Sequence, residues 1–505
     1  MMDFLDLMHL LLLWISTRFL RFIFRRKSKI ILKNVPPGPY MLTYMRNMSS
    51  LVTKPHKYFA DLAESYGPLM SIQLGFVTTV VVSSASLARE VLQKNDAAFS
   101  YRSRAVSFSI LNEEESVVAF LPPNAMWKSL RRMFKAHMFN ASKLESTKGL
   151  RREKLQELIA FVQHRCEFGS MVTVREAVFT TSLNVLSNVF FSIDVADPRC
   201  DRVDQGEFWE LVWAIGKVIG KPNVADYIPI LKLIDPQGIT RRTSFHVRKA
   251  IKILDALIAK RLRSREEKSY VEDNHDVLDD FITICQEQDS ELKLSHIPHV
   301  ILELFVGGTD TTSSTVEWAM AELLHSPEKL KKAQAELEEV IGKGNLVEED
   351  DIDRLPYLKS VVKETFRLHP SVPFLVPRKV ITDVDLCGYT VPKNAQVLVN
   401  VWAIGRDESF WEDGNEFLPE RFINRPDIDV KGHSFELLPF GAGRRTCPGM
   451  HVGYRMVHCV LGSLIHSFDW KLEDGITPQC MDINDTFGFA LRKAQPLRAF
   501  PCRKV

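Results

Sequence analysis

The feature that most constrains this chain is a glycine-rich loop around one cysteine, which reads Phe440-Gly-Ala-Gly-Arg-Arg-Thr-Cys-Pro-Gly449. Its glycines let the backbone turn tightly and approach a flat group closely. Pro448 suits the first position of a helix, so we expect Cys447 just before a helix N-terminus, where free N–H groups and the helix dipole favour a thiolate. The loop therefore predicts a cysteine that binds a metal held in a flat macrocycle.

Two simpler interpretations of this loop compete with a metal ligand. A single cysteine is usually a buried, inert thiol. Gly441-Ala-Gly443 is also half of a dinucleotide-binding G-x-G-x-x-G loop, but the third glycine is absent and no strand–helix unit surrounds it. The five positions Phe440, Gly443, Arg445, Cys447 and Gly449 would coincide by chance in about one chain in ten thousand. We therefore favour the metal ligand.

The composition is that of one large globular domain. The chain has 505 residues, of which 45% are hydrophobic and 25% charged, and no linker-like stretch follows residue 40. The formal net charge of +2 gives no reason to expect a nucleic-acid partner. The eight cysteines form no CxxC pair, which argues for free thiols in a reducing compartment.

The N-terminus differs from the rest of the chain. Residues 4–24 are largely apolar and are followed by the basic residues Arg25, Arg26, Lys27 and Lys29. This pattern predicts a membrane anchor over 1–26 with its basic end in the cytoplasm. Charged residues interrupt the apolar run, so a helix that lies in the membrane interface is the alternative. Residues 27–40, which contain Pro36-Pro-Gly-Pro39, are expected to form a stiff hinge.

Apolar spacing beyond the hinge predicts a mainly α fold with a minor β region near both ends of the catalytic domain. Strands are expected at 70–74, 78–83, 376–381, 385–390 and 396–400. Helices are expected at 126–140, 145–166, 173–193, 206–220, 245–265, 296–325, 327–342, 356–368 and 449–468.

Two further patterns are a set of charged residues and a pair of glycines inside a predicted helix. Glu364 and Arg367 share one helix face, and Arg421 follows in Pro419-Glu-Arg-Phe422; taken alone, the first two would be an ordinary surface pair. Gly307-Gly-Thr-Asp-Thr-Thr312 lies inside a long helix, where each glycine costs about 1 kcal/mol relative to alanine. A threonine that hydrogen-bonds back to the chain could open the helix there, although close helix packing is an equal alternative.

Together these motifs resemble the cytochrome P450 superfamily. The cysteine loop matches the haem-binding signature F-x-x-G-x-R-x-C-x-G at every fixed position. The resemblance implies haem b with the Cys447 thiolate as its axial iron ligand. By the same resemblance, Asp310 relays protons, Thr311 orients a water, and Glu364, Arg367 and Arg421 form a buried structural triad. The remaining cofactor-binding residues implied are Trp127, Arg131, Arg378, Phe440, Gly443, Arg445 and Gly449.

Finer features resemble plant microsomal (A-type) members, in particular the group of geraniol hydroxylase and ferruginol synthase. The resemblance implies a catalytic domain over 41–505 on the cytoplasmic side of the endoplasmic reticulum membrane, held by a single N-terminal anchor. It implies a monooxygenase that uses O₂ and electrons from NADPH, delivered by NADPH–cytochrome P450 reductase. The implied substrate is a small hydrophobic molecule, a terpenoid and among these a diterpene.

Family position also suggests an apolar substrate pocket with few hydrogen-bond donors. The residues expected to line it are Phe108, Ile110, Leu111, Phe305, Val306, Val372, Leu375, Val376, Phe489 and Ala490. A phenolic, an alkaloid or another plant specialised metabolite is the alternative substrate. Other classes of protein are a reductase-independent haem-thiolate isomerase or dehydratase, a haem sensor and a scaffold without haem. The intact Asp310-Thr311 pair, the long helix and the unbroken cysteine loop argue against these three in turn.

Overall fold

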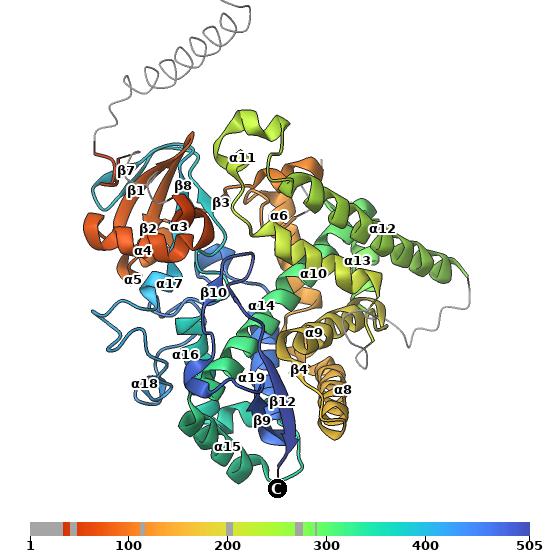
Figure 1. The fold of residues 1–505 in the computed structure, drawn as a ribbon. Helices are drawn as coiled ribbons and strands as arrows, with labels where there is room; N and C mark the ends of the chain where they lie inside the picture. Colours follow the sequence, from red (N-terminus) through yellow and green to blue (C-terminus); the bar gives the residue numbers. More distant parts are fainter. Residues whose placement is uncertain are drawn as a thin grey trace, which may run out of the picture.

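The computed structural model describes residues 34–40, 48–111, 117–197, 206–267, 276–287 and 290–504. Helices dominate this part of the chain, and a small sheet lies to one side of them (Figure 1). The helices are α3 (Met48–Thr53), α4 (Pro55–Tyr66), α5 (Ala85–Arg89), α6 (Ala125–His137), α7 (Ala141–Ser146), α8 (Lys148–Glu167), α9 (Val174–Phe191), α10 (Glu207–Ile219), α11 (Val224–Tyr227), α12 (Ile239–Glu266), α13 (Val277–Gln286), α14 (Ile297–His325), α15 (Pro327–Ile341), α16 (Pro356–Leu368), α17 (Val401–Ile404), α18 (Glu420–Ile423) and α19 (Met450–Ser467).

The strands of the described residues form four small sheets. The largest has the order β1-β2-β8-β5-β3, in which β2 and β8 are parallel and the other pairs antiparallel. A second sheet has the order β4-β12-β9, and β6–β7 and β10–β11 are hairpins. The strands are β1 (Leu69–Leu74), β2 (Val77–Val82), β3 (Tyr101–Arg102), β4 (Val172–Thr173), β5 (Arg378–Lys379), β6 (Val384–Leu386), β7 (Tyr389–Val391), β8 (Gln396–Val399), β9 (Phe468–Leu472), β10 (Asp485–Thr486), β11 (Arg492–Lys493) and β12 (Arg498–Arg503).

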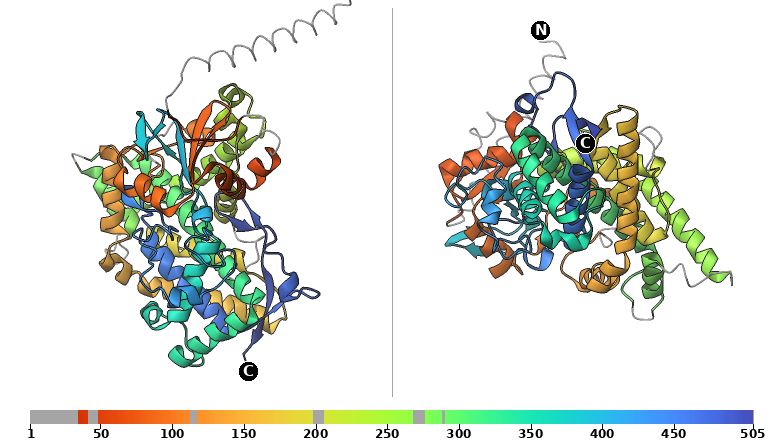
Figure 2. Two further views of the ribbon diagram at one scale, coloured as in Figure 1. Left: turned by 90° about the vertical axis from the view of Figure 1, so that its left-hand side faces the viewer. Right: turned by 90° about the horizontal axis from the view of Figure 1, so that it is seen from below.

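Helix α14 is the central element of the molecule. It passes through the middle of the helical region, and the five-stranded sheet with α3 and α4 lies at the left of the molecule in Figure 1 and in the right-hand panel of Figure 2. Its side chains are apolar or small around most of its circumference, which is the pattern of a buried helix. One hydrophobic core lies between α14, α16 and α19, and another between α14, α9, α10 and α12. Residues on α14 can therefore reach a site inside the protein.

Most of the predicted elements are present, with shifts of a few residues at their ends. The single strand expected over 385–390 is wrong, because β6 and β7 form a hairpin there. Its turn contains Cys387 and Gly388, whose positive φ angles of 52° and 82° cannot continue a strand. The long α12 begins at Ile239 rather than at residue 245, and the sequence prediction missed α4, α13 and the C-terminal strands.

The part of the predicted hinge that is described lies along β1. The Ser71 backbone N–H donates to the carbonyl of Pro37 at 2.8 Å, and the Ser71 hydroxyl donates to that of Pro36 at 2.6 Å. A Cβ atom at Gly38 would lie 1.7 Å from the carbonyl oxygen of Ser71, so only glycine fits. The anchor expected over 1–26 lies outside the described residues. Among those described, no helix is long and apolar enough to cross a membrane.

Candidate functional site

The cysteine loop has the geometry that its sequence predicts. Its middle forms a 3₁₀ turn over Gly443–Arg445, and α19 begins at Met450, directly behind Cys447. The Cys447 backbone N–H donates to the carbonyl of Phe440 at 3.0 Å, which closes the loop. Gly443 has a φ of +69°, and a Cβ atom there would lie 2.0 Å from the carbonyl oxygen of Leu92. The loop therefore depends on glycine both for its turn and for its close approach to the neighbouring helix.

Cys447 lines a cavity of about 730 Å³ inside the protein. The cavity wall also includes Phe440, Gly441 and Gly449 from the same loop, and Thr311 from α14. Burial raises the pKa of Cys447, while a hydrogen bond from the Gly449 backbone N–H and the positive charge of Arg131 act in the opposite direction. The predicted ligand thus faces a space of the size that ligand sites usually have.

Five arginines line the same cavity: Arg104, which donates to the carbonyl of Phe108, and a cluster of four, namely Arg102, Arg131, Arg378 and Arg445. Among the described residues, none of the four has a carboxylate within ion-pair distance, whereas most buried charges in proteins are paired. Burial lowers the pKa of Arg378 and of Arg445 to about 10, and mutual repulsion adds to this effect. Burial also lowers the pKa of Arg102 well below its ordinary value. This cluster is a site for an anion with more than one acidic group.

The predicted cofactor residues on α6 join this cluster. The Asn124 side chain caps α6 by accepting from the Trp127 backbone N–H at 2.9 Å, which fixes the start of the helix. Trp127 and Arg131 then lie on one helix face, and the Arg445 guanidinium stacks over the Trp127 ring at 4.4 Å. Arg102 was missed from the sequence, because it stands in the two-residue strand β3, which pairs with the distant β5, and its burial depends on distant residues.

These observations fit a haem. A haem bound through a thiolate needs a cysteine at one face of its flat macrocycle and, beside that cysteine, backbone without bulky side chains. The Cys447 loop supplies both. Haem also carries two propionate groups, and the unpaired guanidiniums in the cavity wall can receive them through charge-assisted hydrogen bonds. Cys447 is therefore in a position to ligate the iron, and Arg102, Arg131, Arg378 and Arg445 are in a position to hold the propionates.

The glycine pair on α14 faces the cavity, but the helix does not break there. Thr311 donates from its hydroxyl to the carbonyl of Gly307 at 2.7 Å, and Thr312 donates to that of Gly308 at 2.8 Å. The sequence suggested these hydrogen bonds from a threonine hydroxyl back to the main chain. The helix α14 is nevertheless continuous from Ile297 to His325. No neighbouring atom lies within 4 Å of a Cβ built at Gly307, so the space beside it is open.

Asp310 occupies a different environment from that of Thr311. Its carboxylate pairs with Arg175 on α9 and accepts from Arg492 on β11 at 2.6 Å. It is 2% exposed and does not line the cavity, whereas Thr311 does. Although burial raises the pKa of Asp310, the two guanidiniums outweigh it and hold this pKa below its ordinary value. Asp310 is thus ionised and held on the side of α14 that faces α9 and α10.

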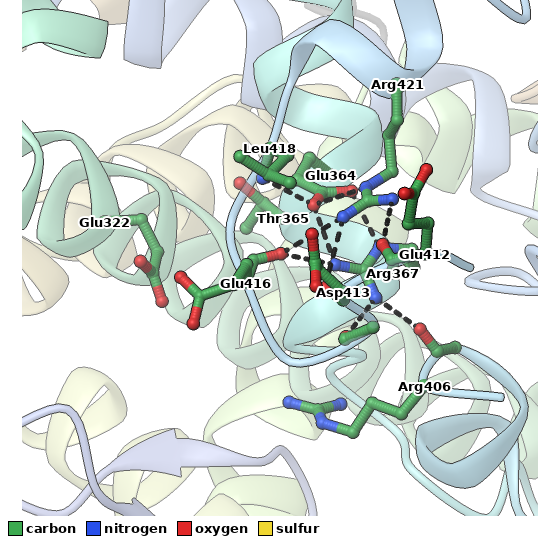
Figure 3. Close-up of polar contacts among 12 residues, drawn as sticks. Glu322, Glu364, Thr365, Arg367, Arg406, Glu412, Asp413, Glu416, Leu418 and Arg421 are labelled. Carbon is green, nitrogen blue, oxygen red and sulfur yellow. Dashed lines mark hydrogen bonds and ion pairs between the residues drawn. The ribbon is translucent and has the colours of Figure 1, made fainter. Parts of the chain in front are cut away.

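The predicted charge triad is buried and connected. Arg367 donates two hydrogen bonds of 2.7 Å to the Glu364 carboxylate, and Arg421 donates a third at 3.0 Å (Figure 3). Glu364 also accepts from the Leu418 backbone N–H at 2.7 Å. Arg367 donates further to the carbonyls of Gly405, Gly414 and Glu416. Sequence reasoning found the three side chains, and the structure adds these backbone groups.

The predicted substrate residues divide into three groups. Those that line the cavity are Phe108, Val306, Val372, Leu375, Val376 and Phe489. The expectation for Phe305 and Ala490 is wrong, because both are fully buried away from the cavity. Phe305 packs among the aromatic rings of α9 and α10, and Leu304 and Gly488 line the cavity nearby. The side chains of Ile110 and Leu111 lie outside the described part of the structure.

Glu303 also lines the cavity, and sequence reasoning did not single it out. Its carboxylate accepts from the backbone N–H groups of Val118 and Ala119, each at 2.6 Å. Burial raises the pKa of Glu303 to about 7. Its position four residues before Gly307 places it on the same helix face, which is a signal that the sequence did contain.

Comparison with known proteins agrees with this site. The cytochrome P450 family model matches residues 36–497. The chain is 48% identical to geraniol 8-hydroxylase of Catharanthus roseus, over 93% of this chain and 94% of that protein. It is 46% identical to drimenol monooxygenase of Persicaria hydropiper, over 94% and 93% respectively.

A solved zebra fish cytochrome P450 with progesterone has the same fold. Its TM-score is 0.74 and its sequence identity 26%, and the match covers 89% of this chain and 99% of that one. Membership implies haem held by a cysteine thiolate, the use of O₂ with electrons from a redox partner, and a small hydrophobic substrate. This chain belongs to the cytochrome P450 family and is a haem-thiolate monooxygenase.

Proposed function

We propose that Cys447 is the axial thiolate ligand of haem b in this monooxygenase. The observation that carries this proposal is one cavity wall that contains Cys447, a glycine-lined loop face and four unpaired guanidiniums. Arg102, Arg131, Arg378 and Arg445 bind the two propionates, and Trp127 supports Arg445 by stacking. Haem-thiolate supplies the activation of O₂ when it is bound.

Thr311 and Asp310 have separate tasks in this proposal. The Thr311 hydroxyl lines the cavity and can orient a water that donates protons during oxygen cleavage. Asp310, ionised between Arg175 and Arg492, can accept a proton and pass it on only when one of these pairs opens. The triad of Glu364, Arg367 and Arg421 has a structural task, which is to fix the segment 405–421 by bonds to its backbone.

The proposed substrate is a terpenoid. The cavity wall around α14 and the 372–376 segment is mostly apolar, so a rigid hydrocarbon skeleton gains about 25 cal/mol for each Å² of apolar surface that it buries there. A charged or sugar-bearing molecule would leave its polar groups unpaired, which is costly. Relatives named for geraniol, drimenol and geranylhydroquinone support this class, and a diterpene is within it.

The experiment for this proposal is turnover in microsomes. The chain is co-expressed with NADPH–cytochrome P450 reductase and given matched sets of mono-, sesqui- and diterpenoids, phenolics, alkaloids, glycosides and amino acids. We expect a product with one added oxygen atom from a terpenoid, dependent on both NADPH and the reductase. Turnover confined to alkaloids, glycosides or amino acids would contradict the terpenoid proposal. Product formation without the reductase would instead indicate an isomerase or dehydratase.

We also propose that residues 1–26 anchor the protein in the endoplasmic reticulum membrane, followed by the hinge 27–40 and the cytoplasmic catalytic domain 41–505. The haem-site residues all follow residue 100, and the hinge ends against β1. Deletion of residues 1–26 should therefore shift the protein from the membrane fraction toward the soluble fraction while its haem spectrum stays intact. A deleted protein that remains fully in the membrane would contradict the anchor.

A further inference from the structure

Asp226 is a carboxylate in the wall of the substrate cavity. It stands in α11, a short helix between the long helices α10 and α12 at the top of the molecule in Figure 1. The backbone holds α11 in place, because the Phe76 N–H donates to the carbonyl of Tyr227 at 2.8 Å. A Cβ atom at Gly75 would lie 2.4 Å from this same carbonyl oxygen, so the β1–β2 turn fits closely against the helix. Asp226 is therefore a fixed feature of the cavity wall.

Within the part of the chain that the structure describes, only one oxygen of Asp226 accepts a hydrogen bond. Its Oδ1 accepts from the Val106 backbone N–H at 2.6 Å. No donor contacts its second oxygen among the described residues, and no lysine or arginine of that part of the chain lies within ion-pair distance. Burial raises the pKa of Asp226 to about 6, because the Val106 bond and the distant Lys232 compensate only in part. The Asp226 side chain is half-buried, and its second oxygen has no protein donor among the described residues.

Most of the cavity wall is apolar, and the residues that line the cavity together with Asp226 include Leu51, Val52, Leu74, Val77 and Phe108. Cys447 and Thr311 mark the reaction site, and they line the same cavity as Asp226. One continuous space therefore connects the reaction site with α11. A ligand with a carbon skeleton near Cys447 can therefore carry one polar group at the α11 wall.

We propose that Asp226 accepts a hydrogen bond from the hydroxyl group of a terpenoid alcohol or phenol and so orients the substrate in the cavity. This inference rests on the terpenoid substrate proposed above, and it adds the functional group that is recognised. A hydroxyl supplies the hydrogen that the free oxygen lacks, whereas a carbonyl or ether oxygen would face the carboxylate with a lone pair. Three relatives are named for compounds with such a hydroxyl: geraniol and drimenol are alcohols, and geranylhydroquinone is a phenol.

A purely structural task for Asp226 is the competing explanation. In that case the carboxylate would serve only to hold Val106, and the functional group of the ligand would not matter. Asp226→Asn separates the two explanations, because the amide oxygen can still accept from Val106 while the second position becomes an N–H donor. Asp255→Asn is the matched control, since it removes one negative charge from an exposed position on α12.

The experiment measures ligand binding by the change in the haem absorbance of the purified full chain at pH 8, where Asp226 is ionised. The probes are geraniol and geranial, and a tricyclic diterpene alcohol with its aldehyde. We expect the wild-type protein and Asp255→Asn to bind the better alcohol about tenfold more tightly than its aldehyde. Asp226→Asn should bind the two about equally, because its amide donates to either oxygen. The carbon-monoxide spectrum checks that each variant retains its haem.

Four other results would count against this inference. An unchanged alcohol preference in Asp226→Asn, or equal binding of alcohol and aldehyde by the wild type, would assign Asp226 to structure alone and leave the terpenoid proposal intact. If no terpenoid probe changes the wild-type spectrum, the terpenoid proposal itself fails, and the inference fails with it. Loss of haem in Asp226→Asn but not in Asp255→Asn would likewise show a structural task.

Discussion

Glu303 and Arg445 bind the same turn, residues 117–121. The Glu303 carboxylate accepts from the N–H groups of Val118 and Ala119 at 2.6 Å each. Arg445 donates to the carbonyls of Val118 and Leu121 at 3.2 and 2.5 Å. The turn therefore joins α14 to the cysteine loop, and it carries Phe120, which lines the cavity.

Replacement of Glu303 by glutamine tests the importance of this turn. The amide can accept only one of the two backbone N–H groups and leaves the other unpaired, which costs about 1–3 kcal/mol when the group is buried. We expect a lower thermal midpoint of the holoprotein and a several-fold weaker affinity for substrate, because the turn forms part of the cavity wall. Titration of substrate against the haem spectrum measures the affinity. Wild-type affinity and stability together would show that the turn is held by other contacts.

Thr311→Ala should separate electron use from product formation. The variant removes a hydroxyl in the cavity wall that donates to Gly307, so the proposed proton-donating water loses its partner. We expect normal haem content and substrate binding, but less product and more peroxide for each NADPH consumed. Thr312→Ala is the matched control, since its hydroxyl makes the same type of bond to Gly308. If the wild type and Thr311→Ala form the same amount of product for each NADPH consumed, Thr311 is only a packing residue.

Loss of the triad should prevent accumulation of the holoprotein. Glu364 and Arg367 are 0% and 1% exposed, and removal of either leaves the other charge buried and unpaired. Such a change typically destabilises a protein by about 3–5 kcal/mol. We expect little haem-containing protein from Glu364→Ala or Arg367→Ala, measured as the ratio of haem to total protein. Normal haem content in either variant would be incompatible with a structural triad.

Short motifs predicted the site better than they predicted its surroundings. The Cys447 loop depends on local spacing, so the sequence indicated it directly. The Glu364–Arg367 pair would have been interpreted as a surface pair by itself, and only the family resemblance identified it as part of a buried triad. Arg102 and Asp226 matter because distant segments place them beside the cavity, and no local pattern indicates that contact. Glu303 was overlooked, although its position on the same helix face as Gly307 was a signal in the sequence. Phe305 was misassigned for a related reason: a helix turns by about 100° per residue, so the neighbouring Val306 faces the cavity while Phe305 faces the aromatic core.

For the fold as well, local patterns were predictable from the sequence and contacts between distant segments were not. Long helices with strong apolar periodicity, such as α14 and α16, were predicted almost to the residue. The C-terminal strands were not, because β12 pairs with β4 and β9, and the β4 residues lie more than 300 positions earlier in the chain. Pairing between such distant segments leaves only a weak signal in each one.

His458 makes the protein sensitive to acid. It is fully buried in α19, and burial lowers its pKa from 6.5 to about 4. Above pH 6.5 it is neutral in both the folded and the unfolded chain. As the pH falls from 6.5 toward 4, only the unfolded chain takes up the proton, so stability is lost over this window. At pH 5 the loss is up to about 2 kcal/mol.

The measurement for His458 is the thermal midpoint of the holoprotein at pH 7.5 and at pH 5. The difference between these two pH values should be smaller in His458→Gln than in the wild type, because glutamine takes up no proton. His433→Gln is the control, since the side chain of His433 is 74% exposed. If all three proteins lose the same stability at pH 5, His458 does not cause the acid sensitivity.

The central claim is that Cys447 ligates the haem iron, and the reduced carbon-monoxide spectrum of Cys447→Ser tests it most directly. Cys459→Ser, which changes a buried cysteine within α19, is the matched control. The claim predicts that Cys447→Ser loses the red-shifted band of thiolate ligation, whether or not it retains haem, and that Cys459→Ser keeps this band. A Cys447→Ser protein that retains the thiolate band would contradict the claim.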